Sequence, residues 1–209
     1  MFVTIEGCER VGKSTYIEML KEYLLKRGIA DKTLFTREPG GSPIAERIRG
    51  VILDPSYLGR MSAHTEALLY AAARCQHIDE TILPALRSGK NVVCDRYIHS
   101  SYAYQAFARG LGKDCVESLN MYAVKNCMPD AVLFIDLSHE RAYSREDGQN
   151  DRMELEAAEF HKRVYEGFKE LERTEKNFYT IKPTGKEETF LRITEILEKI
   201  GFFKLKIEN

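Results

Sequence analysis

The sequence predicts an α/β fold, in which a doubly wound, parallel, five-stranded sheet is flanked by helices. Short apolar runs rich in β-branched residues alternate with longer helical patterns, and this alternation is typical of βαβ units. No low-complexity linker, proline-rich stretch or internal repeat divides the 209 residues. We therefore expect a single domain over 1–209 with helices on both faces of the sheet.

The expected strands are short runs, each followed by a helical pattern. They cover 2–6, 32–36, 91–95, 131–136 and 177–181. Apolar residues at helical spacing predict helices at 13–27, 43–53, 61–88, 97–109, 114–127, 138–145, 154–175 and 186–200. Ligands of such folds bind beyond the carboxyl ends of the strands, so polar residues at those ends are the candidates for chemistry.

The first strand end carries a phosphate-binding loop. Residues 7–14 match the pattern G-x-x-x-x-G-K-[ST] in its strand–loop–helix setting. Glycines let backbone N–H groups turn toward phosphate oxygens, Lys13 adds a mobile positive charge, and the Ser14 hydroxyl can bind Mg²⁺. The motif predicts a nucleotide-binding enzyme. The residues expected around the phosphates are Gly7, Cys8, Glu9, Arg10, Val11, Gly12, Lys13, Ser14 and Thr15.

The third expected strand ends in a carboxylate and a guanidinium. Asp95 can orient water on Mg²⁺, and the adjacent Arg96 can bind a phosphate through two hydrogen bonds. The alternative is a surface ion pair, which is less favoured because a phosphate loop requires an acidic partner for its metal. Arg37, Arg49 and the arginines of 141–152 also follow or adjoin strand ends, which indicates an anion-lined cleft.

The composition excludes several classes of protein. A net charge of −1 provides no basic surface for nucleic acid, so phosphate recognition should be confined to a pocket. Because no apolar stretch reaches membrane-spanning length and no leader pattern precedes the first strand, we expect a cytoplasmic protein without membrane or nucleic-acid partners.

The cysteines are odd in number and lack C-x-x-C spacing, which indicates reduced thiols rather than a disulfide framework. Cys75 with His77, and Cys94 with His99, are scattered pairs without a second cluster of ligands. We therefore expect no metal site built from protein ligands alone. The five cysteines are Cys8, Cys75, Cys94, Cys115 and Cys127.

With these motifs the chain resembles the thymidylate kinase family, mostly its bacterial subgroup, from residue 2 to about residue 168. The matching stretches are the phosphate loop, 36–41, 70–74, 95–105, 128–130, and Asp151-Arg152 followed by 160–164. The resemblance implies a P-loop nucleoside monophosphate kinase fold with a short lid near 145–152. It also implies transfer of the γ-phosphate of ATP to dTMP in dTTP synthesis, with Mg²⁺ and a homodimer.

The resemblance also implies roles at the acceptor site. Tyr70 would stack on thymine and Arg74, one turn later on the same helix face, would donate a hydrogen bond to it. Ser101 would reach the thymine edge and Tyr104 would lie under the sugar. The peptide bond before Pro39 is expected to be cis. The residues expected to bind dTMP are Glu9, Pro39, Arg49, Tyr70, Arg74, Arg96, Ser100, Ser101, Tyr104 and Gln105.

On the donor side, Arg145 would stack on adenine and form the lid with Asp151 and Arg152. The segment 146–150 contains no arginine, whereas Arg10 stands where bacterial members commonly have glycine and eukaryotic-type members a basic residue. We therefore expect Arg10 to neutralise charge on the transferred phosphoryl group, with Arg145 or Arg152 as the alternative. The catalytic residues expected are Lys13, Arg10, Arg96, Asp95 and Glu9, with Ser14 and Asp95 on Mg²⁺.

Two other functions are compatible with part of these observations. Tyr70 replaces the usual Phe and Glu9 the usual Asp, which permits a kinase for another deoxynucleoside monophosphate; its acceptor profile would distinguish it. A nucleotide-sensing switch of the GTPase type is less favoured, because no Asn-Lys-x-Asp motif is present and the 91–95 strand lacks an Asp-x-x-Gly ending.

Overall fold

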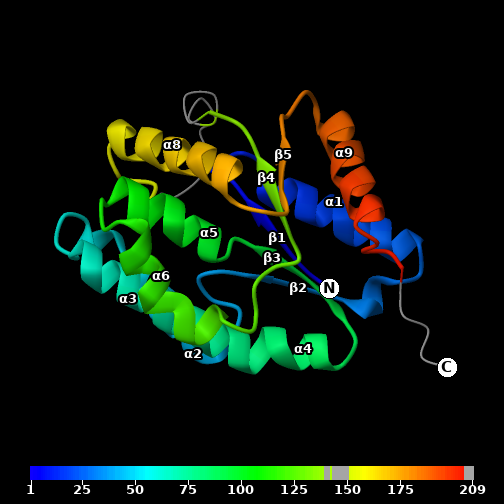
Figure 1. Ribbon diagram of the computed structural model, residues 1–209, viewed down its shortest axis with the longest axis horizontal. Coiled ribbons are helices and arrows are strands. Elements are labelled where there is room, and N and C mark those ends of the chain that lie inside the picture. The colour runs from blue at the N-terminus through cyan, green and yellow to red at the C-terminus, as the bar shows by residue number, and fades with distance from the viewer. Residues whose placement is uncertain (139–141, 143–150, 205–209) are drawn as a thin grey trace.

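A parallel five-stranded sheet forms the centre of the molecule, with the strand order β2-β3-β1-β4-β5 (Figure 1). The structure is a computed structural model, and it describes residues 1–138, 142 and 151–204. The strands are β1 (Phe2–Glu6), β2 (Thr33–Arg37), β3 (Asn91–Asp95), β4 (Ala131–Ile135) and β5 (Phe178–Ile181). The predicted α/β class and all five predicted strands are therefore confirmed, with boundaries within one residue.

The position of each strand follows from its composition. The apolar strands β1 and β4 are buried along their whole length, as expected for central strands covered on both faces. The edge strands β2 and β5 are mostly half-buried and contain threonines. Apolar composition therefore places β1 at the centre, and the loop that follows it is anchored in the most buried part of the sheet.

The strand register brings the chemically active strand ends together. In the parallel pairing of β1 with β3, Ile5 lies opposite Asp95, and in the pairing of β2 with β3, Arg37 lies opposite Asp95. The phosphate loop, the Asp95-Arg96 turn and the segment after Arg37 therefore leave the sheet side by side at its carboxyl edge.

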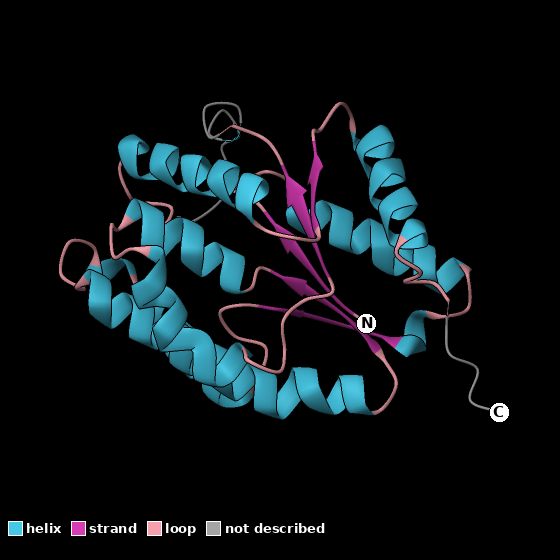
Figure 2. Cartoon of the chain, in the orientation of Figure 1, coloured by secondary structure: helices cyan, strands magenta, loops and turns pink. Residues whose placement is uncertain are grey.

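Helices cover both faces of the sheet (Figures 1 and 2). One face is covered by α1 (Lys13–Lys26) and α9 (Lys186–Lys199). The other face is covered by α2 (Pro43–Leu53), α3 (Ala63–His77), α4 (Leu83–Arg87), α5 (Ile98–Ser101), α6 (Lys113–Val124) and α8 (Ala158–Thr174). Two 3₁₀ turns, Ala30–Lys32 and Pro55–Tyr57, complete the connections. No helix in the described part of the chain is long and apolar enough to cross a bilayer.

Two long predicted helices contain π-helical segments. The predicted helix 61–88 consists of α3, η3 (Ile78–Ile82) and α4, which follow one another without a break. The predicted helix 97–109 consists of α5 and η4 (Tyr102–Ala108). Periodicity does not anticipate these π segments, because they are five and seven residues long, shorter than the window over which a helical pattern is recognised. Most of the predicted helix 138–145 lies outside the described residues.

The predicted start of the last long helix before β5 is wrong by four residues. The prediction was 154, whereas α8 begins at Ala158. Residues 151–155 instead form a turn in which the Asp151 carboxylate accepts hydrogen bonds from the N–H groups of Met153 and Glu154, at 2.8 and 3.0 Å. The Glu154 carboxylate in return accepts the N–H of Asp151 at 3.2 Å. These reciprocal hydrogen bonds have the form of a capping box, and they fix residues 151–154 in a turn that is separate from α8.

The helix α8 crosses η4 at very short distance. A Cβ atom at Gly167 would lie 3.0 Å from Phe107 Cβ and 3.1 Å from Ala103 Cα. The ring of Phe168, the next residue, stacks on Phe134 of β4 with 5.1 Å between centroids. Position 167 must therefore lack a side chain for α8 to reach the core and the segment that carries Tyr104 and Gln105.

Candidate active site

A cavity of about 410 Å³ opens at the carboxyl edge of β1, β2 and β3. We call it the main cavity. It brings together most residues predicted for the site, although they come from segments far apart in the sequence. Its lining consists of Glu9, Arg10, Gly12, Lys13, Ser14, Thr15, Arg37, Glu38, Pro39, Arg49, Leu53, Tyr70, Asp95, Arg96, Ser100, Tyr104, Gln105, Asp151, Met153 and Glu154.

The phosphate loop curls around the ammonium group of Lys13. Lys13 Nζ donates to the carbonyl oxygens of Cys8 at 2.9 Å and of Gly7 at 3.4 Å. Burial, and next the charge of Arg96, lower the pKa of Lys13. Gly7 has φ +150°, and a Cβ there would lie 3.0 Å from the carbonyl oxygen of Ile135, so this position requires glycine. The loop thus holds a buried ammonium group whose positive charge a bound anion would neutralise.

Arg96 connects the phosphate loop to the end of β3. Its φ of 68° is unusual for a residue with a side chain, and such backbone strain is typical of functional sites. Its Nη1 donates to the Gly7 carbonyl at 2.7 Å and to Ser100 Oγ at 3.1 Å, and its Nη2 lies 2.8 Å from Glu9 Oε1. The ring of Tyr104 lies 5.2 Å from the guanidinium. The guanidinium is therefore fixed in the wall of the main cavity.

Glu9 is a half-buried, ionised carboxylate at the same point. Its Oε1 accepts the hydroxyl of Tyr104 at 2.9 Å. Burial alone would raise the pKa of Glu9, but the charges of Arg96 and Lys13 outweigh it and lower the pKa to about 2. Glu9 therefore presents a fixed negative charge beside Arg96, and it can accept a hydrogen bond from a hydroxyl group of a ligand.

Glu6, the last residue of β1, supports this arrangement from below. Its carboxylate accepts the N–H of Tyr97 at 2.8 Å and the hydroxyl of Ser100 at 2.6 Å. Complete burial raises the pKa of Glu6 to about 7. Glu6 thereby fixes Tyr97, the residue after Arg96, and Ser100, which accepts a hydrogen bond from the Arg96 side chain.

Asp95 and Ser14 supply oxygen atoms suited to a divalent cation. Both line the main cavity, and Asp95 Oδ1 is buried without a hydrogen-bond partner among the described residues. Such an oxygen, beside the hydroxyl of the phosphate loop, fits Mg²⁺ that also binds phosphate oxygens. By contrast, the described residues contain no group of three or more His, Cys, Asp or Glu side chains that could hold a metal by themselves.

The wall opposite the phosphate loop is built around Pro39. The Glu38–Pro39 peptide bond is cis, as the resemblance implies. Arg49 Nη1 donates to the carbonyl oxygen of Pro39 at 2.7 Å, and burial, followed by the charge of Arg37, lowers the pKa of Arg49. Arg49 and Arg96 therefore both reach the main cavity, from α2 and from the end of β3.

The structure does not place Arg74 in the main cavity. Its side chain is 1% exposed, donates from Nε to Glu38 Oε2 at 2.7 Å, and also binds Asn120. Glu38 Oε1 lies 3.1 Å from His77 Nδ1. Tyr70 lines the cavity as predicted, whereas Arg74, one turn later, lies behind the Glu38 wall. The helix spacing alone could not distinguish these two environments.

Other predicted site residues also lie outside the lining of the main cavity. Arg152 is 1% exposed, donates to the Ile52 carbonyl at 2.6 Å and pairs with Glu66 at 2.8 Å. Ser101 is buried and does not line the cavity, whereas its neighbour Ser100 does. Arg145 and the rest of 145–150 lie outside the described residues.

Burial raises the pKa of the Cys8 thiol to about 12, and all five cysteines are free thiols.

Arg10 lines the main cavity and has a φ of 61°. Its Nε is 3.5 Å from Glu154 Oε1, so the phosphate loop contacts the capping turn that follows the predicted lid. Arg10 therefore lines the main cavity, and its contact with Glu154 joins the phosphate loop to the turn 151–155.

A second cavity of about 420 Å³ lies on the other side of the phosphate loop. It shares Gly12 and Thr15 with the main cavity, and part of its wall is the turn 183–186 after β5. This turn is not among the predicted site residues, although its Pro-Thr-Gly sequence directly after the last strand is a signal for a loop there. The lining consists of Val11, Gly12, Thr15, Tyr16, Leu137, Pro183, Thr184, Gly185 and Lys186.

Comparison with known proteins identifies the family. The family model for thymidylate kinase matches residues 5–192. The chain belongs to the thymidylate kinase family. The thymidylate kinase of Finegoldia magna is 46% identical over 202 residues, which cover 95% of this chain and 98% of the relative. That of Bacillus velezensis is 44% identical over 210 residues, covering 96% and 98%.

A solved structure supports the same assignment. The thymidylate kinase of Ehrlichia chaffeensis has a TM-score of 0.77 and 27% sequence identity to this chain, and the match covers 95% of this chain and 98% of the other. The resemblance and the P-loop kinase fold predicted from the sequence are therefore confirmed.

Proposed function

We propose that the two cavities form one active site, in which the γ-phosphate of ATP is transferred to dTMP to give ADP and dTDP. Membership of the thymidylate kinase family makes the chain an ATP:dTMP phosphotransferase, as the sequence predicts. The observation that carries the assignment of the site is the convergence of Lys13, Arg96 and Glu9 in the main cavity. The phosphate loop that carries Lys13 also supplies Gly12 and Thr15, which line both cavities.

The main cavity suits the acceptor nucleotide. Tyr70 offers a ring face for the thymine base, and Gln105 and Ser100 offer polar atoms near it. Arg49 and Arg96 approach from two elements and can hold the acceptor phosphate between them. Glu9 and Tyr104, joined by a hydrogen bond, lie where the sugar hydroxyl would bind, with Pro39 completing the wall.

The phosphate loop and the second cavity suit ATP. The loop separates the two cavities, so phosphates bound on it face the acceptor on one side and their nucleoside lies on the other. The turn 183–186 then forms the outer wall of the nucleoside site. We retain Arg145 as a residue that covers adenine; it lies outside the described residues.

Charge stabilisation accounts for most of the catalysis expected here, because phosphoryl transfer depends on positioning and electrostatics. Lys13 and Arg10 bring positive charge to the phosphates, and Arg96 holds the acceptor phosphate in line. Ser14 and Asp95 would hold Mg²⁺, which neutralises the donor phosphates when bound. Glu9 fixes Arg96 by their ion pair and keeps it from pairing elsewhere.

Initial-rate kinetics over dTMP, dUMP, dCMP and dGMP test the assignment of the main cavity. We expect dTMP to give the highest kcat/KM with ATP and Mg²⁺, and we expect Arg49→Ala to raise the KM for dTMP with little change in that for ATP. Equal changes in both KM values would contradict the placement of the acceptor phosphate.

We also infer a homodimer, formed through the surface of α2, α3 and α6. The helix α3 contacts both neighbours, and the three helices expose large apolar side chains that water solvates poorly. They are Ile44, Val51, Leu68, Met121 and Tyr122. Light scattering should give twice the chain mass, and Leu68→Glu should give the mass of one chain.

We place the enzyme in the cytoplasm, with its nucleotide substrates.

A further inference from the structure

Glu66, on α3, is a buried carboxylate that neither sequence motifs nor the proposed mechanism use. Its side chain is 1% exposed, yet three side chains from other parts of the chain donate hydrogen bonds to it or pair with it. Arg109 binds both of its oxygens, at 3.2 and 2.9 Å, and Arg152 Nη1 lies 2.8 Å from Oε2. The third donor is Gln105 Nε2, at 2.9 Å from Oε1.

The two arginines keep Glu66 ionised. Burial alone would raise the pKa of Glu66, but the hydrogen bonds and charge of Arg109, with further contributions from Gln105 and Arg152, lower it. An ionised carboxylate can only accept hydrogen bonds. Glu66 is therefore an obligatory acceptor at neutral pH.

This property decides the orientation of the Gln105 amide. The amide nitrogen must face Glu66, because the opposite orientation would bring the amide oxygen against a carboxylate oxygen. Gln105 also lines the main cavity, and its Oε1 is buried without a hydrogen-bond partner among the described residues. A buried acceptor without a donor is unfavourable, so a ligand that brings an N–H group to this oxygen binds better.

The acceptor bases differ at the atom that would meet this oxygen. Thymine and uracil carry an N–H donor at N3, whereas cytosine carries an acceptor nitrogen there. We propose that Glu66 is a positioning residue that fixes the Gln105 amide with its oxygen available to the acceptor base, and thereby selects a base with an N3–H donor. This inference rests on the proposed placement of dTMP in the main cavity.

The test is the ratio of kcat/KM for dTMP to kcat/KM for dCMP. In Glu66→Gln the new amide can donate to Gln105 as well as accept from it, so Gln105 is no longer held in one orientation. We expect the ratio to fall about tenfold or more, mostly through a higher KM for dTMP, while the KM for ATP changes little.

A second variant, Glu66→Asp, separates the effect on Gln105 from a general loss of folding. Glu66→Asp keeps the negative charge for Arg109 and Arg152 but is one methylene shorter, so the neutral Gln105 amide is the partner most easily lost. The ratio should again fall, by about threefold or more, with a smaller decrease in thermal stability than in Glu66→Gln. In a Gln105→Met background, Glu66→Asp should cause no further change in the ratio, because the two side chains act as a unit.

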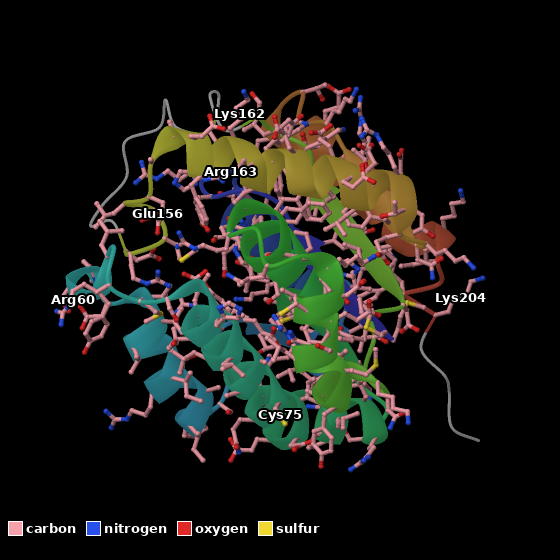
Figure 3. All side chains as sticks on the ribbon, turned by 60° about the vertical axis from the view of Figure 1, so that its left-hand side comes forward. Arg60, Cys75, Glu156, Lys162, Arg163 and Lys204 are labelled. Carbon is pink, nitrogen blue, oxygen red and sulfur yellow. The ribbon has the colours of Figure 1, made fainter. Side chains whose placement is uncertain are left out.

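Glu156 provides the matched control. It binds the same Arg109 but is not a partner of Gln105, and it lies on the turn before α8 (Figure 3). Glu156→Gln should weaken the same ionic cluster and leave the dTMP/dCMP ratio unchanged. An unchanged ratio in both Glu66 variants, or an equal fall in Glu156→Gln, would overturn the positioning role. A wild-type enzyme without preference for dTMP over dCMP would instead overturn the placement of dTMP in the main cavity.

Discussion

Arg74 and Glu38 form an ion pair with 2.7 Å between Nε and Oε2, in which the two side chains are 1% and 2% exposed. The pair ties α3 to the segment that carries Pro39. Arg74→Ala leaves a buried carboxylate without its charge partner, so we expect the free energy of unfolding to fall by about 3–5 kcal/mol, measured by urea denaturation. The KM for dTMP should rise more than that for ATP, because the Pro39 wall loses its support.

The exposed pair of Arg37 with Glu46 is the control for this measurement. Its side chains are 54% and 40% exposed, so Arg37→Ala should cost less than about 1 kcal/mol. A loss of similar size in both variants would show that burial of the Arg74–Glu38 pair is not what makes it important.

Arg10→Gly should lower kcat by at least about 10³, with small changes in both KM values, if Arg10 neutralises charge on the transferred phosphoryl group. Glycine adopts the φ of 61° at this position without strain, so a backbone effect is avoided. Steady-state and single-turnover kinetics give the values. A kcat within threefold of wild type would return the role to Arg145, and an equal loss in Glu154→Gln would assign the effect to the Arg10–Glu154 contact.

Gly167→Ala should destabilise the protein by about 1–3 kcal/mol, because the added methyl group would overpack the crossing of α8 with η4. Gly50, in α2, is the matched control: a Cβ there meets no atom within 4 Å. Gly50→Ala should stabilise the protein by about 0.5–1 kcal/mol through helix propensity. Two stabilising alanines in thermal melts would contradict the close helix crossing.

The thymine methyl group should matter to the acceptor preference. We expect kcat/KM for dUMP to be several-fold to about tenfold lower than for dTMP, because a buried methyl group is worth on the order of 1 kcal/mol. Tyr70 is the side chain proposed to contact the methyl group, so Tyr70→Ala should reduce the difference in kcat/KM between dTMP and dUMP. Equal kcat/KM values in the wild-type enzyme would show that the methyl group is not buried in the main cavity.

Glu6 should make stability depend on pH. Its pKa is about 7 in the folded protein against an ordinary value of 4.5, so the folded state holds the proton more tightly. The contribution of Glu6 to the free energy of unfolding is therefore greatest below pH 4.5 and falls as the pH rises toward 7, by up to about 1.4 kcal/mol per pH unit. The free energy of unfolding of Glu6→Gln minus that of the wild type should therefore rise as the pH increases from 4.5 to 7. A constant difference would contradict the raised pKa.

The parts of the site that the sequence predicts are local motifs at strand ends. The phosphate loop and the Asp95-Arg96 turn each lie within a few residues, and the parallel sheet necessarily brings them to one edge. The environment of Arg74 is not local: its partner Glu38 is 36 residues away, and helix spacing gives the same face for a cavity-lining and a buried arginine. Glu66 was missed for the same reason, since its partners are distant in sequence. The turn 183–186 carries a local Pro-Thr-Gly signal, but its place beside the phosphate loop depends on the fold.

The two cavities draw on different parts of the gene. Every lining residue of the main cavity precedes Met153 and Glu154 or is one of them, whereas the second cavity needs the turn 183–186. A ribosome adds residues from the N-terminus, so a nascent chain contains the whole lining of the main cavity before it contains that of the second. A message truncated ahead of β5 therefore encodes the residues proposed to recognise dTMP, but lacks a wall of the cavity proposed for the nucleoside of ATP.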